Sequence, residues 1–201
     1  VLDAALAAGY PSTRPLYAEA RALRPAQRLR KGAGETLRYA IAPCPLGLLL
    51  LAASERGVCA LLFGDDEPVL EQELRERFAA ARLQRDQAGL GDWLQAVVGQ
   101  LEEPARAAKL PLDLRGSAFQ QRVWQALQAI PPGQTRRYGE LANALDSHAR
   151  AVARACASNP VGLLVPCHRV VGAQQALTGY RWGLARKAAL LAGEAREKPG
   201  D

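Results

Sequence analysis

The 201-residue chain contains no methionine and only two histidines, His148 and His168. Because its first residue is Val, we expect the sequence to be a piece of a longer gene product. No apolar run approaches the roughly 20 residues that a membrane-spanning helix needs. The first residues also lack the basic region and long apolar core of a secretory signal peptide. We therefore expect a protein that neither crosses a membrane nor is exported.

Cysteine is scarce as well. The four cysteines, Cys44, Cys59, Cys156 and Cys167, are widely spaced and form no C-x-x-C pair. This spacing argues against a zinc knuckle and against a disulfide framework. We expect reduced thiols in a cytoplasmic compartment and no metal site.

The net charge of +6 is unevenly distributed along the chain. Residues 65–103 carry ten acidic and four basic side chains, whereas residues 104–201 carry fourteen basic and six acidic ones. A basic segment beside an acidic one favours a polyanionic partner on one side of the protein only. A GC-rich coding bias would also enrich arginine, but it does not account for the acidic middle of the chain.

Residues 1–33 predict a helix that ends at Gly9 and a basic helix that Ser12 can cap. A helix, a glycine turn and a basic helix together make a helix-turn-helix candidate. The sequence G-Y-P-S-T-R-P-L-Y, followed by L-R-P-A-Q-R-L-R-K-G, resembles the second half of an AraC-type DNA-binding domain. The first half of such a domain is absent, so we expect only a remnant of a DNA reader.

Residues 36–112 predict a small α/β unit. Residues 37–42 suggest a strand. Apolar runs of strand length cover residues 47–53 and 58–63, and a plausible hairpin turn joins these two runs. Asp65 or Asp66 can cap the helix that follows, and a further helix is expected around residues 90–101. This unit contains no constellation of residues that suggests catalysis.

Residues 113–198 read as a helical unit. Ser117 and Gln120 form a capping box that opens the first helix. A short helix over 138–145 is followed by a basic helix over 148–158, which Ser147 can cap. This is again a helix-turn-helix pattern, although an ordinary helical hairpin with a solvated arginine face has the same signature. A closing helix over 184–197 is expected to bury Leu184, Ala188 and Leu191.

The pair Cys167 and His168 is the strongest candidate for chemistry. A thiolate is a strong nucleophile, and an imidazole within reach can take its proton. On the dipeptide alone, a buried structural cysteine beside a solvated histidine is the more common arrangement. Two other functional classes remain as alternatives: a DNA-binding regulator whose main function lies in residues 1–33, and a thiol hydrolase.

Four segments in order raise the significance of this pair. They are I-P-P-G-Q-T-R-R-Y-G-E-L-A, R-A-V-A-R-A-C-A-S-N-P, V-P-C-H-R-V-V and T-G-Y-R-W-G-L-A-R-K-A-A-L-L. From about residue 35 to 197 the chain resembles the methylated-DNA–protein-cysteine methyltransferases, which repair O6-alkylguanine. The likeness is closest to the C-terminal half of the bacterial adaptive-response members, which also carry an AraC-type segment.

The resemblance implies an α/β (α+β) fold in two domains. Residues 36–112 would form a small ribonuclease-H-like α/β domain. Residues 113–198 would form a winged-helix-like helix-turn-helix domain that binds DNA and carries the active site. Residues 1–33 would be the AraC-type remnant.

The resemblance also implies roles for individual residues. Cys167 would accept the methyl group, His168 would be its base, and Glu194 would orient that histidine. Asn159 would brace the turn before the active site. Tyr138 would bind the guanine edge and could donate the proton that the leaving guanine needs.

DNA contacts are implied for the second helix of the motif. Arg150 would fill the gap left by the extruded nucleotide, although the turn before it is slightly shorter than is usual in the family. The small side chains of Ala149 and Ala151 would let the helix approach the minor groove closely. Arg137 stands where the family usually has a Ser, and Arg154 stands where small residues are common. Both departures would strengthen phosphate contacts. The residues expected to line the substrate pocket are Pro166, Arg169, Val170 and Tyr180.

The implied activity is that of a methylated-DNA–[protein]-cysteine S-methyltransferase. A monomer in the bacterial cytoplasm would flip O6-methylguanine out of double-stranded DNA and transfer the methyl group irreversibly to Cys167, once. O4-methylthymine is a second candidate substrate. No cofactor and no metal are expected, because the DNA itself supplies the methyl group.

Overall fold

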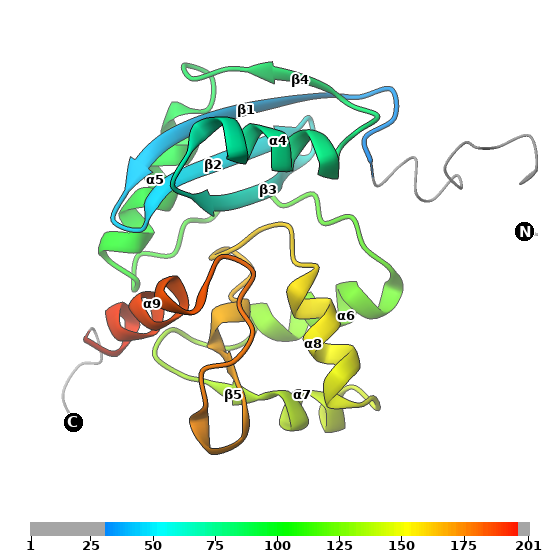
Figure 1. Ribbon diagram of the computed structural model, residues 1–201, viewed down its shortest axis with the longest axis vertical. Coiled ribbons are helices and arrows are strands. Elements are labelled where there is room, and N and C mark those ends of the chain that lie inside the picture. The colour runs from blue at the N-terminus through cyan, green and yellow to red at the C-terminus, as the bar shows by residue number, and fades with distance from the viewer. Residues whose placement is uncertain (1–30, 197–201) are drawn as a thin grey trace, which may run out of the picture.

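A four-stranded sheet forms the upper half of the computed structural model, which describes residues 31–196 (Figure 1). Its strands are β1 (Thr36–Cys44), β2 (Gly47–Ser54), β3 (Gly57–Gly64) and β4 (Arg82–Arg85), in the order β3-β2-β1-β4. The first three strands pair antiparallel, and β4 runs parallel to β1. The sequence patterns predicted the three antiparallel strands, whereas the polar β4 has no such signal. The predicted remnant over residues 1–33 lies almost entirely outside the described residues.

Two helices accompany this sheet. The helix α4 (Glu67–Arg77) begins at Asp66, whose Oδ1 accepts a hydrogen bond from the Val69 backbone N–H at 2.9 Å. It contacts β3, while α5 (Gly91–Glu102) contacts β1. The cap predicted at Asp65 or Asp66 is therefore confirmed at Asp66.

The lower half of the molecule is mainly helical (Figure 1). It contains α6 (Ala118–Gln128), α7 (Tyr138–Ala144), α8 (Ala149–Ala157) and α9 (Leu184–Arg196). Two short strands, β5 (Arg136–Arg137) and β6 (Val170–Val171), pair parallel, and two 3-10 turns, η1 (Cys167–Arg169) and η2 (Ala173–Gln175), complete it. The predicted capping box of Ser117 and Gln120 is present. None of the helices within residues 31–196 is long and apolar enough to cross a bilayer.

Two predicted details of these helices are wrong. The cap of α8 is His148, whose Nδ1 accepts a hydrogen bond from the Ala151 N–H at 3.2 Å, and not Ser147. The buried face of α9 holds Lys187, Leu190 and Glu194, whereas Leu184 of the predicted face is 48% exposed. The predicted residues and the buried residues both recur at helical spacing. The face that is buried is the one on which Lys187 and Glu194 find hydrogen-bond partners inside the protein.

The free edge of β3 joins the two halves. The Leu61 N–H donates to the Pro160 carbonyl at 2.9 Å, and the Gly162 N–H donates to the Leu61 carbonyl at 3.1 Å. Trp182 packs edge-on against Phe63 of β3, with ring centroids 5.8 Å apart. The chain that leads to Cys167 is therefore attached to the sheet.

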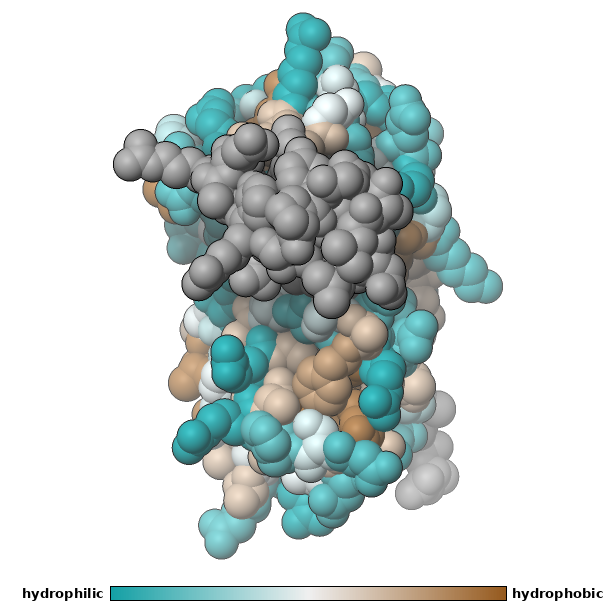
Figure 2. All heavy atoms as spheres, turned by 90° about the vertical axis from the view of Figure 1, so that its right-hand side faces the viewer, coloured by the Kyte–Doolittle hydropathy of each residue, from teal (hydrophilic) through white to brown (hydrophobic). Residues whose placement is uncertain are grey.

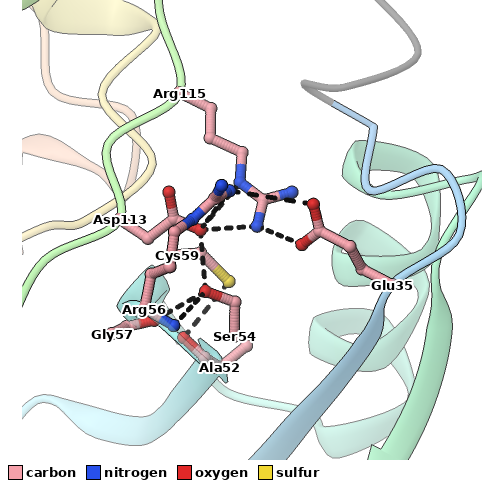
Figure 3. A network of polar contacts seen from close by, with 8 residues as sticks. All are labelled: Glu35, Ala52, Ser54, Arg56, Gly57, Cys59, Asp113 and Arg115. Carbon is pink, nitrogen blue, oxygen red and sulfur yellow. Dashed lines mark hydrogen bonds and ion pairs between the residues drawn. The ribbon is translucent and has the colours of Figure 1, made fainter.

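A polar network fastens the connection between the halves (Figure 3). Arg115 Nη2 lies 2.5 Å from carboxylate oxygens of both Asp113 and Glu35, and the Ser54 hydroxyl donates to Asp113 at 2.7 Å. Burial opposes ionisation of Asp113, but hydrogen bonds from Arg115 and Ser54 hold the pKa of this carboxyl below its ordinary value. The network ties the start of β1, the β2–β3 hairpin and the connecting segment together.

This network is expected to stabilise the fold measurably. Removing one partner of a largely buried ion pair typically costs about 3–5 kcal/mol, whereas exposed pairs contribute about 1 kcal/mol or less. Asp113→Ala is expected to lower the free energy of unfolding in urea by about 3 kcal/mol. Arg38→Ala, which breaks the exposed Arg38–Asp86 pair, is the matched control and is expected to have a much smaller effect. Equal losses in the two variants would contradict this ranking.

Candidate active site

Asn159 positions the thiol of Cys167. Its Nδ2 donates to Cys167 Sγ at 3.2 Å and to the Val165 carbonyl at 2.8 Å, while its Oδ1 accepts from the Val161 N–H at 3.0 Å. Asn159 is fully buried, and Cys167 is 4% exposed. Burial raises the pKa of the Cys167 thiol, and the Asn159 hydrogen bond and the Lys187 charge oppose that rise. The protein at rest therefore holds a thiol, so a nearby base is needed to form the thiolate.

His168 and Glu194 form a buried pair, with His168 Nε2 and Glu194 Oε1 2.8 Å apart. Burial lowers the pKa of His168 below its ordinary value, so the ring is neutral at pH 7. Because the carboxylate can only accept, Nε2 carries the ring proton and Nδ1 keeps a free lone pair. Nδ1 is buried and has no hydrogen-bond partner within residues 31–196. This atom is thus available as a proton acceptor.

Glu194 is held by more than the histidine. Arg169 Nε and Nη2 donate to its Oε1 at 3.0 and 2.8 Å, and the Gly133 N–H donates to its Oε2 at 3.1 Å. Burial disfavours the charged carboxylate, but hydrogen bonds from His168 and Arg169 outweigh it and lower the pKa of Glu194 to about 2. Glu194 is therefore an anion at all physiological pH values. It brings together α9, η1 and the segment between α6 and β5.

A fully buried lysine completes the polar centre. Lys187 Nζ donates to the carbonyls of Val170 and Thr178 at 2.5 and 2.7 Å. Burial lowers its pKa, and nearby Cys167 and Cys156 oppose that shift. Within residues 31–196 this ammonium forms no ion pair with a carboxylate, and its charge acts on the Cys167 thiol. Lys187 was not predicted as a site residue, although its position two helical turns before Glu194 places both on one face of α9.

A cavity of about 360 Å³ opens at Cys167. Its lining residues are Tyr138, Ala153, Cys156, Ala157, Cys167, Gly179, Tyr180 and Arg181. A volume of this size is within the range of small-ligand pockets and admits a nucleobase. Burial raises the pKa of Tyr138 to about 12, and its hydroxyl lies 3.5 Å from the Gly179 carbonyl. Its phenol therefore keeps its proton at neutral pH.

Three residues that were predicted to line this pocket lie elsewhere in the structure. Pro166, Arg169 and Val170 are buried, but none of them lines the cavity. Arg169 points instead at Glu194 and at the Ile130 carbonyl, because a buried guanidinium requires acceptors for its donors. Tyr180 lines the cavity as predicted. Cys156 and Arg181 line it too and were not predicted, since only the fold brings their segments together.

The residues predicted to contact DNA lie largely on the surface. Ala149, Arg150 and Arg154 of α8 are exposed, and Ala151 is half-buried. Arg137 is exposed at the start of α7, where its Nε forms an ion pair with Glu140 at 2.8 Å. On the side where α6 and α8 lie, apolar side chains form a patch that hydrophilic ones border (Figure 2). Small side chains flanked by cations give α8 a surface that suits close contact with a polyanion.

In residues 31–196 there is no group of three or more histidine, cysteine, aspartate or glutamate side chains that could hold a metal ion.

Two family models together match most of the described chain. The ribonuclease-like domain of 6-O-methylguanine DNA methyltransferase matches residues 37–114, and the DNA-binding domain of the same family matches residues 118–196. A crystal structure of Mycobacterium tuberculosis O6-methylguanine methyltransferase is 37% identical, with a TM-score of 0.63, over 82% of this chain and 96% of that one. Mycobacterium tuberculosis OGT in complex with DNA is similar as well, with a TM-score of 0.63 and 38% identity over 81% of this chain and 95% of that one.

Curated relatives give the same assignment. The methylated-DNA–protein-cysteine methyltransferase of Mycolicibacterium paratuberculosis is 43% identical over 81% of this chain and 95% of its own length. The bifunctional transcriptional activator/DNA repair enzyme Ada of Escherichia coli is 45% identical over 98% of this chain. This chain spans only 57% of the length of that Ada protein, and 56% of the regulatory protein ada of Salmonella typhimurium.

The lowered pKa of Glu194 makes the stability of the fold depend on pH. The folded-state pKa of Glu194 is lowered from 4.5 to about 2, so its contribution is present above pH 4.5 and is lost as the pH falls toward 2. A shift of this size corresponds to stabilisation on the order of 3 kcal/mol. His168, whose pKa is lowered, adds a loss that begins below about pH 6.5.

The free energy of unfolding, measured from pH 7 to pH 2, is therefore expected to decline steadily in the wild type. Glu194→Gln is expected to be less stable at pH 7 and to lack the component below pH 4.5. Curves that run parallel over the whole range would show that Glu194 is not the group responsible.

Proposed function

Because the chain belongs to the family of methylated-DNA–protein-cysteine methyltransferases, we propose that it repairs O6-methylguanine by transferring the methyl group to its own Cys167. The observation that carries this proposal is the position of the Cys167 thiol. It lies at a cavity that admits a base, is fixed by Asn159, and neighbours a neutral histidine that a carboxylate orients. These parts supply a nucleophile, a proton acceptor and room for the substrate.

The chemical step is a single displacement. The thiol proton passes toward His168 Nδ1, directly or through one water molecule. The Sγ–CH₃ bond forms as the bond between the methyl carbon and O6 breaks, and the electron pair leaves with the guanine. The phenol of Tyr138 gives a proton to the leaving guanine and regains one from the histidine through solvent. The sum replaces one thiol hydrogen by methyl and returns an unmodified guanine.

Electrostatics within the site favour the thiolate during this step. The Lys187 ammonium stabilises the negative charge on sulfur, and the Glu194 carboxylate stabilises the imidazolium that forms on His168. The product is a thioether, and its S–CH₃ bond is not cleaved under these conditions, so the thiol of Cys167 is not regenerated. The protein therefore acts once per molecule, and Cys167 is the final destination of the methyl group.

Duplex DNA is the proposed partner, contacted through α8 in the minor groove. The methyl group lies inside the duplex, so the nucleotide must be extruded, which costs a few kcal/mol. Arg150, exposed in the first turn of α8, offsets part of this cost by occupying the vacated space. Ala149 and Ala151 allow the helix to lie close to the duplex, while Arg137 and Arg154 pair with phosphates.

The two units over residues 36–112 and 113–198 divide the work. The second carries the chemistry and the DNA contacts, and the first supports the segment that leads to Cys167. We propose that a monomer in the bacterial cytoplasm is sufficient, because one protein molecule meets one lesion.

Incubation with a duplex that contains a single O6-methylguanine tests the proposal. The mass of the Cys167 peptide is expected to increase by one CH₂ equivalent, because methyl replaces hydrogen. Uptake is expected to stop at one methyl group per protein molecule.

The matched control is Cys167→Ser, which keeps the size of the side chain but removes the nucleophile. Cys156→Ser controls for the second thiol at the same cavity. No mass gain in the wild type, or a gain that persists in Cys167→Ser, would refute the proposal.

A further inference from the structure

One cation at the rim of the Cys167 cavity is held by an acidic residue from the other half of the molecule. Arg181 Nε and Nη2 lie 2.9 and 2.6 Å from Oε1 of Glu73, which belongs to α4 beside the sheet. The Arg181 side chain is 34% exposed and that of Glu73 is 26% exposed, so the pair faces solvent. Neither residue takes part in the chemistry described above.

Glu73 already has a second partner. Arg77, one turn further along α4, has its Nη2 3.8 Å from the same Oε1 atom. Burial, and then repulsion from Arg181, lower the pKa of Arg77 to about 10. Its Nε is buried without a hydrogen-bond partner within residues 31–196. Two guanidinium groups therefore compete for one carboxylate. If Arg181 moved away, Glu73 would keep its ion pair with Arg77.

The loop that carries Arg181 is built so that this side chain alone is free to change partner. Gly179 and Gly183, with φ of +50° and +93°, bound the loop in left-handed conformations that favour glycine. Between them, Tyr180 packs against Trp182 with ring centroids 5.3 Å apart, and Trp182 packs against Phe63. The aromatic neighbours of Arg181 are thus anchored, whereas Arg181 is held by a solvent-facing ion pair.

Resting on the proposed function, we propose that Arg181 binds a phosphate of the damaged strand and that Glu73 competes with that phosphate for it. An ion pair that faces water contributes little, so a phosphate can displace the carboxylate. A backbone phosphate also matches the guanidinium fork, and the neighbouring phosphates of the duplex add to the negative field that attracts Arg181. Glu73 is then an autoinhibitory contact that weakens DNA binding, and Arg77 takes over the carboxylate when DNA is bound.

The direction in which two substitutions change DNA affinity distinguishes competition by Glu73 from a purely structural role of the ion pair. Glu73→Gln and Arg181→Gln break the same ion pair. If the pair only holds the loop, both variants shift DNA affinity in the same direction. If Glu73 competes with phosphate, Glu73→Gln strengthens binding and Arg181→Gln weakens it.

The measurement is the rate of methyl uptake from an O6-methylguanine duplex at protein concentrations below saturation, over a series of salt concentrations. We expect the rate to rise about twofold to fivefold in Glu73→Gln, because the exposed ion pair that competes with the phosphate is weak. We expect it to fall about threefold to tenfold in Arg181→Gln, the effect of roughly one phosphate contact. The double variant is expected to match Arg181→Gln. The salt dependence is expected to weaken by about one charge in Arg181→Gln.

Glu76→Gln is the matched control, because it removes the same charge from an exposed position on α4, where Glu76 accepts a hydrogen bond from Gln72. A gain equal to that of Glu73→Gln would trace the effect to general repulsion and overturn the proposal. Shifts of the two variants in the same direction would overturn it as well. Wild-type methyl uptake on Cys167 together with either result leaves the proposed function standing, whereas absence of wild-type uptake overturns both.

Discussion

The rest of the site depends on the hydrogen bonds that the buried carboxylate of Glu194 accepts. This carboxylate is buried, ionised, and accepts hydrogen bonds from His168, Arg169 and the Gly133 backbone. An unpaired charge in such surroundings would be strongly unfavourable, so the hydrogen bonds of Glu194 hold α9, η1 and the segment after α6 together. The interaction that sets the tautomer of the proposed base is therefore also one that closes the fold.

The sheet contributes to the site without supplying a reactive group. Its β3 edge pairs with Pro160 and Gly162, directly after Asn159, and Trp182 packs on Phe63. These contacts fix both the segment that leads to Cys167 and the loop that lines the cavity. A proposed nucleophile that must wait as a thiol, with its pKa raised by burial, benefits from a rigid mount because its partners are then already in place.

Local signals predicted much of the fold. The strands β2 and β3 are apolar runs, Asp66 and Ser117 are caps, and each depends on residues a few positions away. The polar strand β4 and the buried face of α9 escaped prediction because long-range partners determine them. The same division holds in the site. The motifs singled out Cys167, His168, Asn159 and Glu194, whereas the place of Arg169 at Glu194 and the burial of Lys187 follow only from the assembled structure.

The central claim is that Glu194 holds His168 as a neutral base with its Nδ1 lone pair free. Nitrogen NMR of the histidine rings measures this directly, and the chain has only two histidines to assign, with His148→Gln identifying the second. At pH 7 the account predicts that His168 carries its proton on Nε2 and none on Nδ1. A His168 ring protonated on Nδ1, or on both nitrogens, at that pH would contradict the account.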